Sequence, residues 1–497
     1  MYLIYFVCNV YYTEVSNYVI KLFFLKVDMH IEIKEGDTSN AKPLKAHESL
    51  LLRIYKKIDF EPPKDKYSYF VQKLKEEYKK NRNIRIAVDT CVHCGACIDA
   101  CPTYLTTKDL KNSPVGRAEL LRDVIKRKKK IDDAILETIY TYYWQCLTCR
   151  RCAYVCPFGI DQADITRYVR GVLFEIGLVN RFGAMTIDKH LDMGNAMGIT
   201  PAAAENILSY FTKEIKSERG ISVEFHLYRH DKGKMFKYVG GELIGEVERD
   251  KWPKAILYPS SADLFLNTEA LKGYITFLNA YKLPFVIHTK CIEVANFGLW
   301  INEKIMYKIA QFYINAAKEL GVEMAIFGEC GHGWRAFKNL VAPELEKSGI
   351  KAYHIHHLVV KAIKEGKIKL NPEANGDIVY MYQDPCQYSR GGDLYEEPRF
   401  ILKHVVKKTV ECPQNRQLNW CCGGQAGMLA EELKPLRLKY GTLWYECAIN
   451  NGAQKVIRPC SMCKGTLNSV IGDLNKMYGK NLTYGGLMDL VYRAIVF

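Results

Sequence analysis

The chain has 497 residues, of which 48% are apolar, and its 70 lysines and arginines outnumber 55 acidic residues, giving a net charge of +15. This length and apolar content exclude a disordered chain and predict a globular protein of about two to four domains. The positive charge is interleaved with acidic residues except in Lys126–Lys130. Because no recognised nucleic-acid-binding motif accompanies it, a nucleic-acid-binding protein is not favoured. The run is predicted to be a solvated helix end, and contact with anionic lipid or an acidic partner is the alternative.

Residues 1–83 are predicted to form an N-terminal extension and a linker. The stretch Met1–Lys26 is rich in Tyr, Phe, Val and Ile, but polar residues interrupt it. A membrane-spanning helix needs about 20 consecutive apolar residues, and the stretch lacks the basic start and cleavage site of a signal peptide. We therefore expect residues 1–28 not to be native, with translation starting at Met29, and a membrane-surface helix is the alternative. A charged helix is predicted over Tyr67–Lys80, after two consecutive prolines.

Two cysteine runs of identical spacing follow, CVHCGACIDACP at Cys91–Pro102 and CLTCRRCAYVCP at Cys146–Pro157. Each is the bacterial ferredoxin run C-x2-C-x2-C-x3-C-P, in which three thiolates on one loop hold one cluster and the fourth cysteine ligates the other. Because the complete run occurs twice, two 4Fe–4S clusters are favoured over zinc sites. The predicted ligands are Cys91, Cys94, Cys97 and Cys156 for one cluster, and Cys146, Cys149, Cys152 and Cys101 for the other.

The sequence around these runs has helical periodicity. Apolar residues recur at helical spacing over Val115–Lys130, Ile131–Trp144 and Asp161–Gly177. Thr200-Pro201 has the N-cap and first-position proline of a further helix. We therefore predict an α-helical two-cluster ferredoxin domain over residues 84–215, rather than a small β-rich ferredoxin.

The second half of the chain alternates strand and helix patterns, after a polar stretch, Lys216–Asp250, that is predicted to be a linker. The expected strands are AILYPS, PFVIHT, EMAIFG, DIVYMYQ and KVIRPC, and helical segments begin at Asn267, Asn302, Pro398 and Leu433. Such alternation is typical of parallel α/β units. The predicted fold class is therefore α+β multidomain, with the helical ferredoxin module followed by two tandem α/β units over residues 254–366 and 377–497.

Five cysteines of the last unit form the pattern Cys…Cys-Cys-Gly…Cys-x-x-Cys. DPC ends at Cys386, WCCGG ends at Gly424 and RPCSMC ends at Cys463. Gly423 and Gly424 permit the sharp bend that adjacent cysteines need, and the close approach of another group. They are candidate cofactor-binding residues, predicted to leave the approach to the cluster unobstructed by side chains. Five thiolates exceed the four ligands of a zinc ion or an ordinary cubane cluster, so a special metal–sulfur site is favoured over a zinc ribbon or buried free cysteines. The candidate ligands are Cys386, Cys421, Cys422, Cys460 and Cys463.

The remaining cysteines fall outside these motifs. Clustering of the 18 cysteines as Cys-x-x-Cys in a large chain indicates metal binding in a reducing compartment rather than a disulfide framework. Cys8, Cys412 and Cys447 lack a motif and are predicted to be ordinary cysteines.

The two α/β units align with each other as an internal repeat, at offsets of about 130 residues. The first unit has lost three of the five ligand positions, so it is predicted to hold no cluster. Glu329, Cys330 and His332 are candidates to line a cleft shared by the two units, although a satisfied buried histidine and cysteine are the alternative. The matched positions are Ser260 with Cys386, Lys290 and Cys291 with Cys421 and Cys422, Cys330 with Cys460, and Gly333 with Cys463.

The five-cysteine pattern resembles the cysteine-rich CCG domain of heterodisulfide reductases and their relatives, and the resemblance extends over almost the whole chain. It is closest to the K-type subunit of the membrane complex that accompanies dissimilatory sulfite reductase, which is also described as a D-type heterodisulfide-reductase-like protein. The shared stretches are EVANFG at Glu293–Gly298, GECGHGWR at Gly328–Arg335 and GLMDLVY at Gly486–Tyr492. The resemblance implies that the five cysteines hold a noncubane 4Fe–4S cluster.

The resemblance also implies an enzyme, an iron–sulfur oxidoreductase acting on a sulfur group. Electrons would pass from a quinol-linked, cytochrome b-type membrane subunit through the two 4Fe–4S clusters to the noncubane cluster. There a disulfide or trisulfide on a small sulfur-carrier protein would be reduced or oxidised, in dissimilatory sulfur metabolism. His332 would supply a proton to the leaving thiolate. The expected location is cytoplasmic, at the membrane through the partner subunit.

The alternative function is a pure electron conduit. The iron–sulfur subunits of two flavin dehydrogenases, anaerobic glycerol-3-phosphate dehydrogenase (its C-type component) and glycolate oxidase, share the two ferredoxin runs followed by CCG units. They relay electrons from a flavoprotein to quinone without substrate chemistry of their own. Only the GECGHGWR and GLMDLVY stretches favour the sulfur enzyme.

Overall fold

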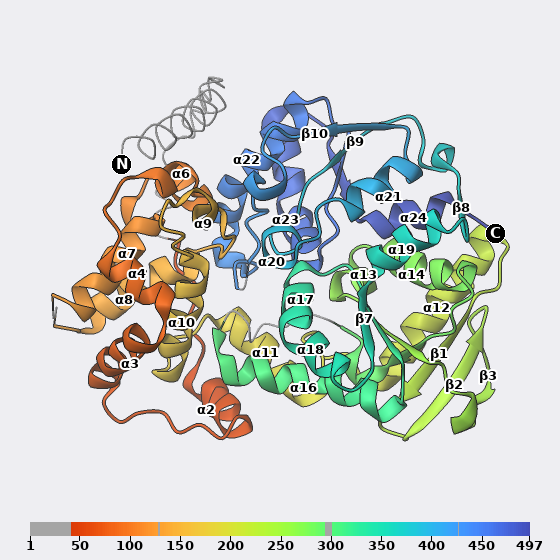
Figure 1. Ribbon diagram of the computed structural model, residues 1–497, viewed down its shortest axis with the longest axis horizontal. Helices are drawn as coiled ribbons and strands as arrows, with labels where there is room; N and C mark the ends of the chain where they lie inside the picture. Colours follow the sequence, from red (N-terminus) through yellow and green to blue (C-terminus); the bar gives the residue numbers. More distant parts are fainter. Residues whose placement is uncertain (1–40, 128–129, 294–300, 426) are drawn as a thin grey trace, which may run out of the picture. The chain divides into compact units, whose positions relative to one another are not determined.

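The computed structural model describes residues 41–127, 130–293, 301–425 and 427–497 (Figure 1). The expectations for residues 1–28 and for Cys8, and most of the EVANFG stretch, lie outside the described residues. No helix within the described ranges is both long enough and apolar enough to cross a membrane.

The N-terminal part of the described chain is helical, as predicted. Thr200 caps α12 by accepting a hydrogen bond from the backbone N–H of Ala203, and Pro201 takes the first helical position. Pro102 likewise begins α6 directly after Cys101. The helices are α2 (Glu48–Lys57), α3 (Lys66–Lys80), α4 (Arg82–Asp89), α5 (Ala96–Asp99), α6 (Pro102–Thr107), α7 (Pro114–Ile125), α8 (Asp133–Gln145), α9 (Arg151–Val155), α10 (Gln162–Glu175), α11 (Arg181–Met193) and α12 (Pro201–Arg219).

Two stretches predicted as linkers are structured. α2 buries Leu50, Leu51 and Ile54 and packs against α11, so part of the N-terminal linker belongs to the core. The linker prediction for Lys216–Asp250 is also wrong, because this stretch completes α12 and forms β1 (Glu224–Arg229), β2 (Lys234–Val239) and β3 (Glu242–Glu246). β1 is buried between β2 and β5, whereas β3 is an exposed edge strand whose polar residues face solvent.

All five predicted strands are present, and they lie in two sheets. The larger sheet has the order β3-β2-β1-β5-β4-β6-β7 and the smaller one β10-β9-β11-β12. The strands are β4 (Ala255–Tyr258), β5 (Val286–His288), β6 (Met324–Phe327), β7 (Lys351–His354), β9 (Val379–Tyr382), β10 (Lys408–Glu411), β11 (Lys455–Ile457) and β12 (Thr483–Gly485); β8 (Lys369–Leu370) pairs separately with β13 (Ile495–Val496).

The two sheets share one strand order. Within the larger sheet, the neighbouring strands β5-β4-β6-β7 are parallel. The first of them in the chain, β4, lies between the second, β5, and the third, β6, and the fourth, β7, lies beyond β6. The strands β10-β9-β11-β12 repeat that order in parallel. Ligands of open α/β sheets bind beyond the carboxyl ends of the strands. The residues that follow β9, β10 and β11, and those that follow β4, β5 and β6, are therefore the candidate site positions.

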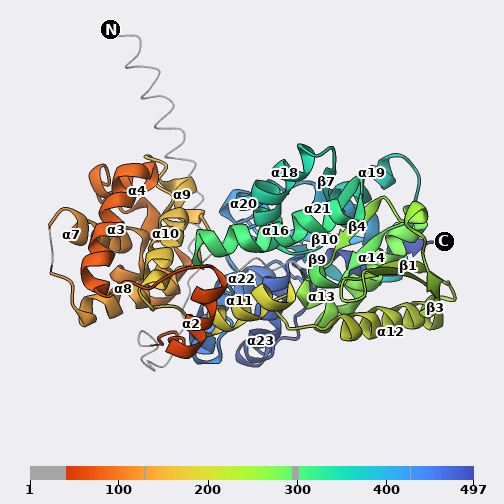
Figure 2. The same cartoon turned by 90° about the horizontal axis from the view of Figure 1, so that it is seen from below.

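Helices cover both sheets and join them (Figures 1 and 2). α14 of the first unit packs against α24 of the second so closely that a Cβ on Gly273 would lie 2.2 Å from the carbonyl oxygen of Met488. The helices are α13 (Ser261–Phe265), α14 (Thr268–Ala280), α16 (Glu303–Leu320), α17 (Gly331–Ala336), α18 (Ala342–Glu346), α19 (Ile355–Lys364), α20 (Ser389–Gly392), α21 (Glu397–Val405), α22 (Lys434–Asn450), α23 (Ser461–Tyr478) and α24 (Leu487–Ala494).

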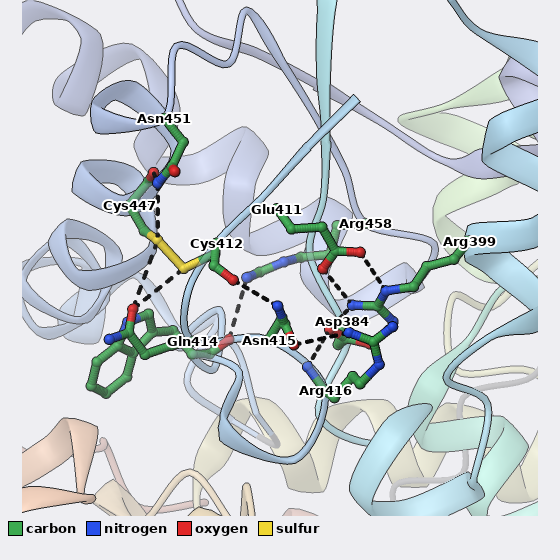
Figure 3. Close-up of a disulfide and its surroundings, with 11 residues drawn as sticks. Asp384, Arg399, Glu411, Cys412, Gln414, Asn415, Arg416, Cys447, Asn451 and Arg458 are labelled. Atoms are coloured by element: carbon green, nitrogen blue, oxygen red, sulfur yellow. Dashed lines mark hydrogen bonds and ion pairs between the residues drawn. A yellow bond between two sulfur atoms is a disulfide. The ribbon is translucent and has the colours of Figure 1, made fainter. Parts of the chain in front are cut away.

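A disulfide joins Cys412, at the end of β10, to Cys447 on α22 (Figure 3). The prediction that these two cysteines are ordinary is therefore wrong: each lacks a motif, and only the fold brings them together. Asn415 donates a hydrogen bond to the Cys412 carbonyl oxygen at 2.9 Å, so the bridge anchors the start of the segment that leads to Cys421.

Replacing Cys412 by Ser should lower the free energy of unfolding by about 2–4 kcal/mol, because the bridge closes a loop across 35 positions of sequence separation. Thermal unfolding of the parent and variant without reductant measures the effect. Dithiothreitol should lower the melting temperature of the parent towards that of the variant. Equal melting temperatures without reductant would contradict a closed bridge in the parent.

Candidate metal–sulfur site

The two ferredoxin runs lie against each other in the helical part, and their cysteines surround two small hollows. One hollow is lined by Cys91, Cys94, Cys97 and Cys156, and Cys152 also borders it. The other is lined by Cys101 together with Cys146, Cys149 and Cys152. The structure thus places the fourth cysteine of each run beside the first three of the other run, the arrangement that crossed ligation requires.

The two hollows differ in depth. Cys94 of the first hollow is exposed, whereas Cys101, Cys146 and Cys149 of the second are buried. Burial raises the pKa of Cys101, and the Arg117 guanidinium opposes that rise. Arg117 is itself buried. A buried cationic side chain beside several thiols suits an anionic thiolate-ligated cluster, since such a charge needs a counter-charge in the interior.

Replacing Cys101 by Ala should perturb the cluster held mainly by the second run, because Cys101 lines the second hollow and not the first. Mössbauer and EPR spectra of the variant should show loss or conversion of one 4Fe–4S cluster. The same substitution at Cys156 should affect the other cluster. Loss confined to the first-run cluster in the Cys101→Ala protein would refute crossed ligation.

The five cysteines of the last unit lie together beyond the carboxyl ends of the smaller sheet. Cys386 follows β9, Cys421 and Cys422 follow β10, and Cys460 follows β11 and caps α23. The sulfurs of Cys386 and Cys421 are 3.9 Å apart. All five side chains are buried, so the fold concentrates five thiols in one interior site.

Hydrogen bonds connect these thiols into one chain. Cys422 contacts both Cys421 and Cys463, and these bonds hold the pKa of Cys422 well below its ordinary value. Cys463 in turn contacts Cys460. Backbone N–H groups also point at the sulfurs: Gly424 donates to Cys422 Sγ at 3.4 Å and Gly331 to Cys460 Sγ at 3.3 Å. Hydrogen bonds of this kind are typical of thiolates in iron–sulfur sites.

The two glycines after Cys422 have a different role from the one predicted. Gly423 has φ +91°, which provides the expected bend. However, a Cβ on Gly424 would lie 1.4 Å from Thr466 Oγ1, and one on Gly423 would lie 2.9 Å from Tyr440 Cβ. The glycines therefore let α22 and α23 pack against the cysteine loop, and they do not leave the approach to the site open.

The first α/β unit contributes to the same site. Cys330, which caps α17, is hydrogen-bonded to Cys460, and this bond together with burial raises the pKa of Cys330 well above its ordinary value. Burial would raise the pKa of the Cys460 thiol, but Cys330, Cys463 and the nearby His332 lower it well below its ordinary value. By contrast, Cys291 donates to the carbonyl oxygen of Phe312. The structure thus brings Cys330 and His332 to the five thiols, while Cys291 binds elsewhere.

Buried arginines join the second ferredoxin run to the five-thiol site, and sequence reasoning missed them. Arg390 donates to the carbonyl oxygen of Cys149 at 2.6 Å and to that of Asn419 at 3.1 Å. The Arg151 guanidinium lies 3.5 Å from the centre of the Trp420 ring. Cys149 itself is hydrogen-bonded to Cys421, which lowers the pKa of Cys149 to about 6. The second ferredoxin run and the five-thiol site therefore lie side by side.

Two histidines that belong to no sequence motif also lie in this region. His354 Nε2 lies 2.8 Å from the Tyr388 hydroxyl, and Tyr388 is two residues from Cys386. His356 Nε2 lies 3.0 Å from Glu329 Oε1. The sequence gives His354 and His356 no metal-binding motif, so only the fold could reveal their partners.

The residues present fit iron–sulfur clusters. Thirteen thiols in three groups, backbone N–H donors aimed at sulfur and buried arginine side chains supply ligands, hydrogen bonds and counter-charge. Family models support the same assignment: residues 87–160 match the 4Fe-4S dicluster domain, and residues 380–468 match the cysteine-rich CCG domain. The chain is an iron–sulfur protein with a dicluster domain and a CCG domain.

Comparison with known proteins confirms the predicted resemblance to the D-type component of heterodisulfide reductases. The predicted iron–sulfur cofactors are confirmed by the two family models. The Hdr-like menaquinol oxidoreductase iron-sulfur subunit 2 of Archaeoglobus fulgidus is 28% identical, over 88% of this chain and 85% of its own length. The D-type component of the dihydromethanophenazine:CoB–CoM heterodisulfide reductase of Methanosarcina barkeri is 23% identical, over 77% and 88%. The EtfAB:quinone oxidoreductase of Syntrophomonas wolfei is 22% identical, over 69% of this chain but 48% of its own length.

Proposed function

We propose that this chain is a heterodisulfide reductase-like oxidoreductase subunit that exchanges electrons with a protein-borne disulfide or trisulfide at the five-thiol site. The observation that carries the proposal is the continuity of the thiols. Cys149 of the dicluster domain contacts Cys421, and the chain of contacts continues through Cys422 and Cys463 to Cys460. Electrons that leave the dicluster domain therefore arrive at a site with more thiols than an ordinary cubane needs.

The domain assignment belongs to this proposal. Residues 84–215 would form the dicluster domain, residues 254–366 a degenerate CCG-type unit and residues 377–497 the CCG-type unit with a noncubane 4Fe–4S cluster. The shared strand order of the two sheets supports a duplication. So does the matching placement of Cys330 and Cys460, each of which caps a helix after the third strand of its unit.

The clusters would supply single electrons and a sulfur-binding iron site. The chain's own residues would hold that site and handle protons. Arg390 fixes the second ferredoxin loop against the cysteine loops through the carbonyl oxygens of Cys149 and Asn419. His332, which contacts Cys460, would donate a proton to the thiolate released from the substrate.

The partners are proposed from the relatives and from the surface position of one hollow. A quinol-linked, cytochrome b-type membrane subunit would exchange electrons with the exposed first-run cluster, where Cys94 reaches the surface. A small sulfur-carrier protein of dissimilatory sulfur metabolism would present the cysteine disulfide or trisulfide. The chain would then lie on the cytoplasmic face of the membrane through its partner subunit. The relative named as a menaquinol oxidoreductase subunit supports the quinol link.

An EPR spectrum of the oxidised protein with and without added thiol tests this proposal against the conduit alternative, which the EtfAB:quinone oxidoreductase relative represents. A sulfur-active site should give a paramagnetic signal that appears only with thiol and is distinct from the two cubane clusters. A conduit should give the same spectrum with and without thiol.

A further inference from the structure

A buried group of charges lies directly behind the five-thiol site and joins the two α/β units. The ammonium of Lys464 donates to Asp263 Oδ1 at 2.5 Å and to Glu329 Oε2 at 3.0 Å. The side chains of all three residues are 0% exposed. Lys464 follows Cys463 in α23, and Glu329 precedes Cys330. The group is therefore one residue away from the thiols on both sides of the site.

Every element packed around Asp263 contributes to this group. Ser260 and Tyr274 donate to Asp263 Oδ2. The N-terminus of α24 donates to Glu329, through the backbone N–H groups of Leu487 and Met488 at 3.0 and 2.9 Å. The titratable and charged groups that act on Asp263 directly or through its neighbours are Lys464 from α23, Glu329 after β6, Tyr274 from α14, His356 from α19, and Asp489 from α24 with Lys455 of β11 beside it.

At the buried centre of the group, carboxyl groups outnumber ammonium groups. Asp263, Glu329 and Asp489 are buried carboxyl groups, and Lys464 is the ammonium bonded to two of them. Burial disfavours ionised carboxylates unless each has a partner. Burial alone would raise the pKa of Glu329, but the Lys464 charge and the His356 hydrogen bond lower this pKa to about 2. Burial raises the pKa of Asp263 to about 6 despite Lys464. Of the two carboxyl groups bonded to Lys464, Asp263 is thus the one that changes its proton near neutral pH.

We propose that Asp263 takes up one proton from solvent each time the CCG-domain cluster accepts one electron from the dicluster domain. The electron adds one negative charge beside Lys464 and the proton removes one from Asp263, so the net charge of the buried region does not change. When two electrons pass on to a disulfide, two protons leave with them, and one disulfide becomes two thiols. This inference rests on the proposed function, because it requires a redox-active cluster at the five thiols.

The position of Asp263 suits proton exchange with solvent. Asp263 belongs to the short helix α13. Phe265 and Leu266, two and three positions further along the chain, are exposed. Asn267, which is only half-buried, donates to Asp489 Oδ1 at 2.9 Å and connects the acidic group to the surface. The buried acidic group therefore has a half-buried polar side chain between it and the surface.

Potentiometric EPR titrations of the full chain between about pH 5 and pH 9 test the proposal, because a group linked to reduction makes the midpoint potential depend on pH. Below about pH 6 the potential of the CCG-domain cluster should be constant, since Asp263 is already protonated in the oxidised state. Above that pH it should fall by about 59 mV per pH unit, the shift for one proton per electron.

Asp263→Asn should abolish this slope while the two cubane clusters keep their potentials. Asp188→Asn is the matched control: Asp188 is a mostly buried carboxylate paired with Lys57 on the helical side, and the variant should keep the slope. A slope that persists in Asp263→Asn, or a parent protein whose potential does not vary with pH, would overturn the inference.

A second measurement covers the case in which Asp263→Asn does not fold. Reduction of the parent protein in weakly buffered solution near pH 7, followed with a pH indicator, should consume about one proton per electron entering the CCG-domain cluster. If the protein takes up no protons on reduction, this inference is overturned, but the proposed function still stands. A parent protein without a cluster at the five thiols would overturn the proposed function and this inference together.

Discussion

Replacing Cys422 by Ser should remove or convert the CCG-domain cluster and reduce its thiol-dependent chemistry about 100-fold or more, with both cubane clusters intact. Cys422 is the middle link of the thiol chain, with contacts to Cys421 and Cys463. A serine hydroxyl is a harder and shorter ligand that suits iron–sulfur sites poorly. Removing a residue that only supports a metal ligand already lowers metal affinity or activity about 10- to 100-fold. Removing a ligand itself should lower them at least as much.

Iron and sulfide analysis, together with EPR spectra with and without thiol, measures this effect. The matched control is Cys291→Ser, because Cys291 is equally buried but donates to the Phe312 carbonyl oxygen. The control should keep its iron content and its thiol-dependent signal. If Cys422→Ser also kept both, Cys422 would not be a ligand and the five-cysteine site would have to be revised.

Replacing Lys464 by Met should destabilise the protein by about 3–5 kcal/mol, because removal of one partner leaves buried charges uncompensated. Lys464 is bonded to Asp263 and Glu329, both of which are fully buried. Methionine fills a similar volume, so the loss would come from charge rather than from a cavity. Glu329 would also lose one of its bonds between the two α/β units.

Thermal unfolding under anaerobic conditions measures the destabilisation as a fall in melting temperature. Lys272→Met is the matched control, since Lys272 is 4% exposed but pairs with Glu214 and Glu218, whose side chains are 31% and 46% exposed. Those carboxylates can be hydrated after the substitution, so the control should lose much less stability. Equal losses in the two variants would show that the buried charge group does not stabilise the junction of the units.

Local signals in the sequence predicted most of the fold. The ferredoxin runs and the Thr200-Pro201 helix start are short-range patterns, and five apolar runs predicted five strands correctly. The β1–β3 segment was missed because its polar residues suit a linker as well as an edge strand such as β3, which is largely exposed. α2 was missed because a ten-residue helix depends on packing, here against α11, to be stable.

The candidate site was predictable only where its residues share a motif. The five cysteines follow from their spacing, but the position of Cys421 beside Cys149 depends on how the dicluster and CCG domains pack. Arg390 and Lys464 have no motif, and their importance appears only from burial and partners. The role of Gly424 was misjudged because a sequence cannot show that Thr466 occupies the space where a side chain would be.

The most direct test of sulfur chemistry at the five-thiol site is thiol release from a sulfur-bridged carrier protein by the reduced full-length chain. We predict two thiols released for every two electrons that leave the protein, in step with oxidation of the CCG-domain cluster. Release should disappear in Cys422→Ser, while both cubane clusters still accept electrons. Oxidation of the protein by an artificial acceptor with no thiol release from the carrier, in parent and variant alike, would contradict the proposed function and establish the chain as an electron conduit.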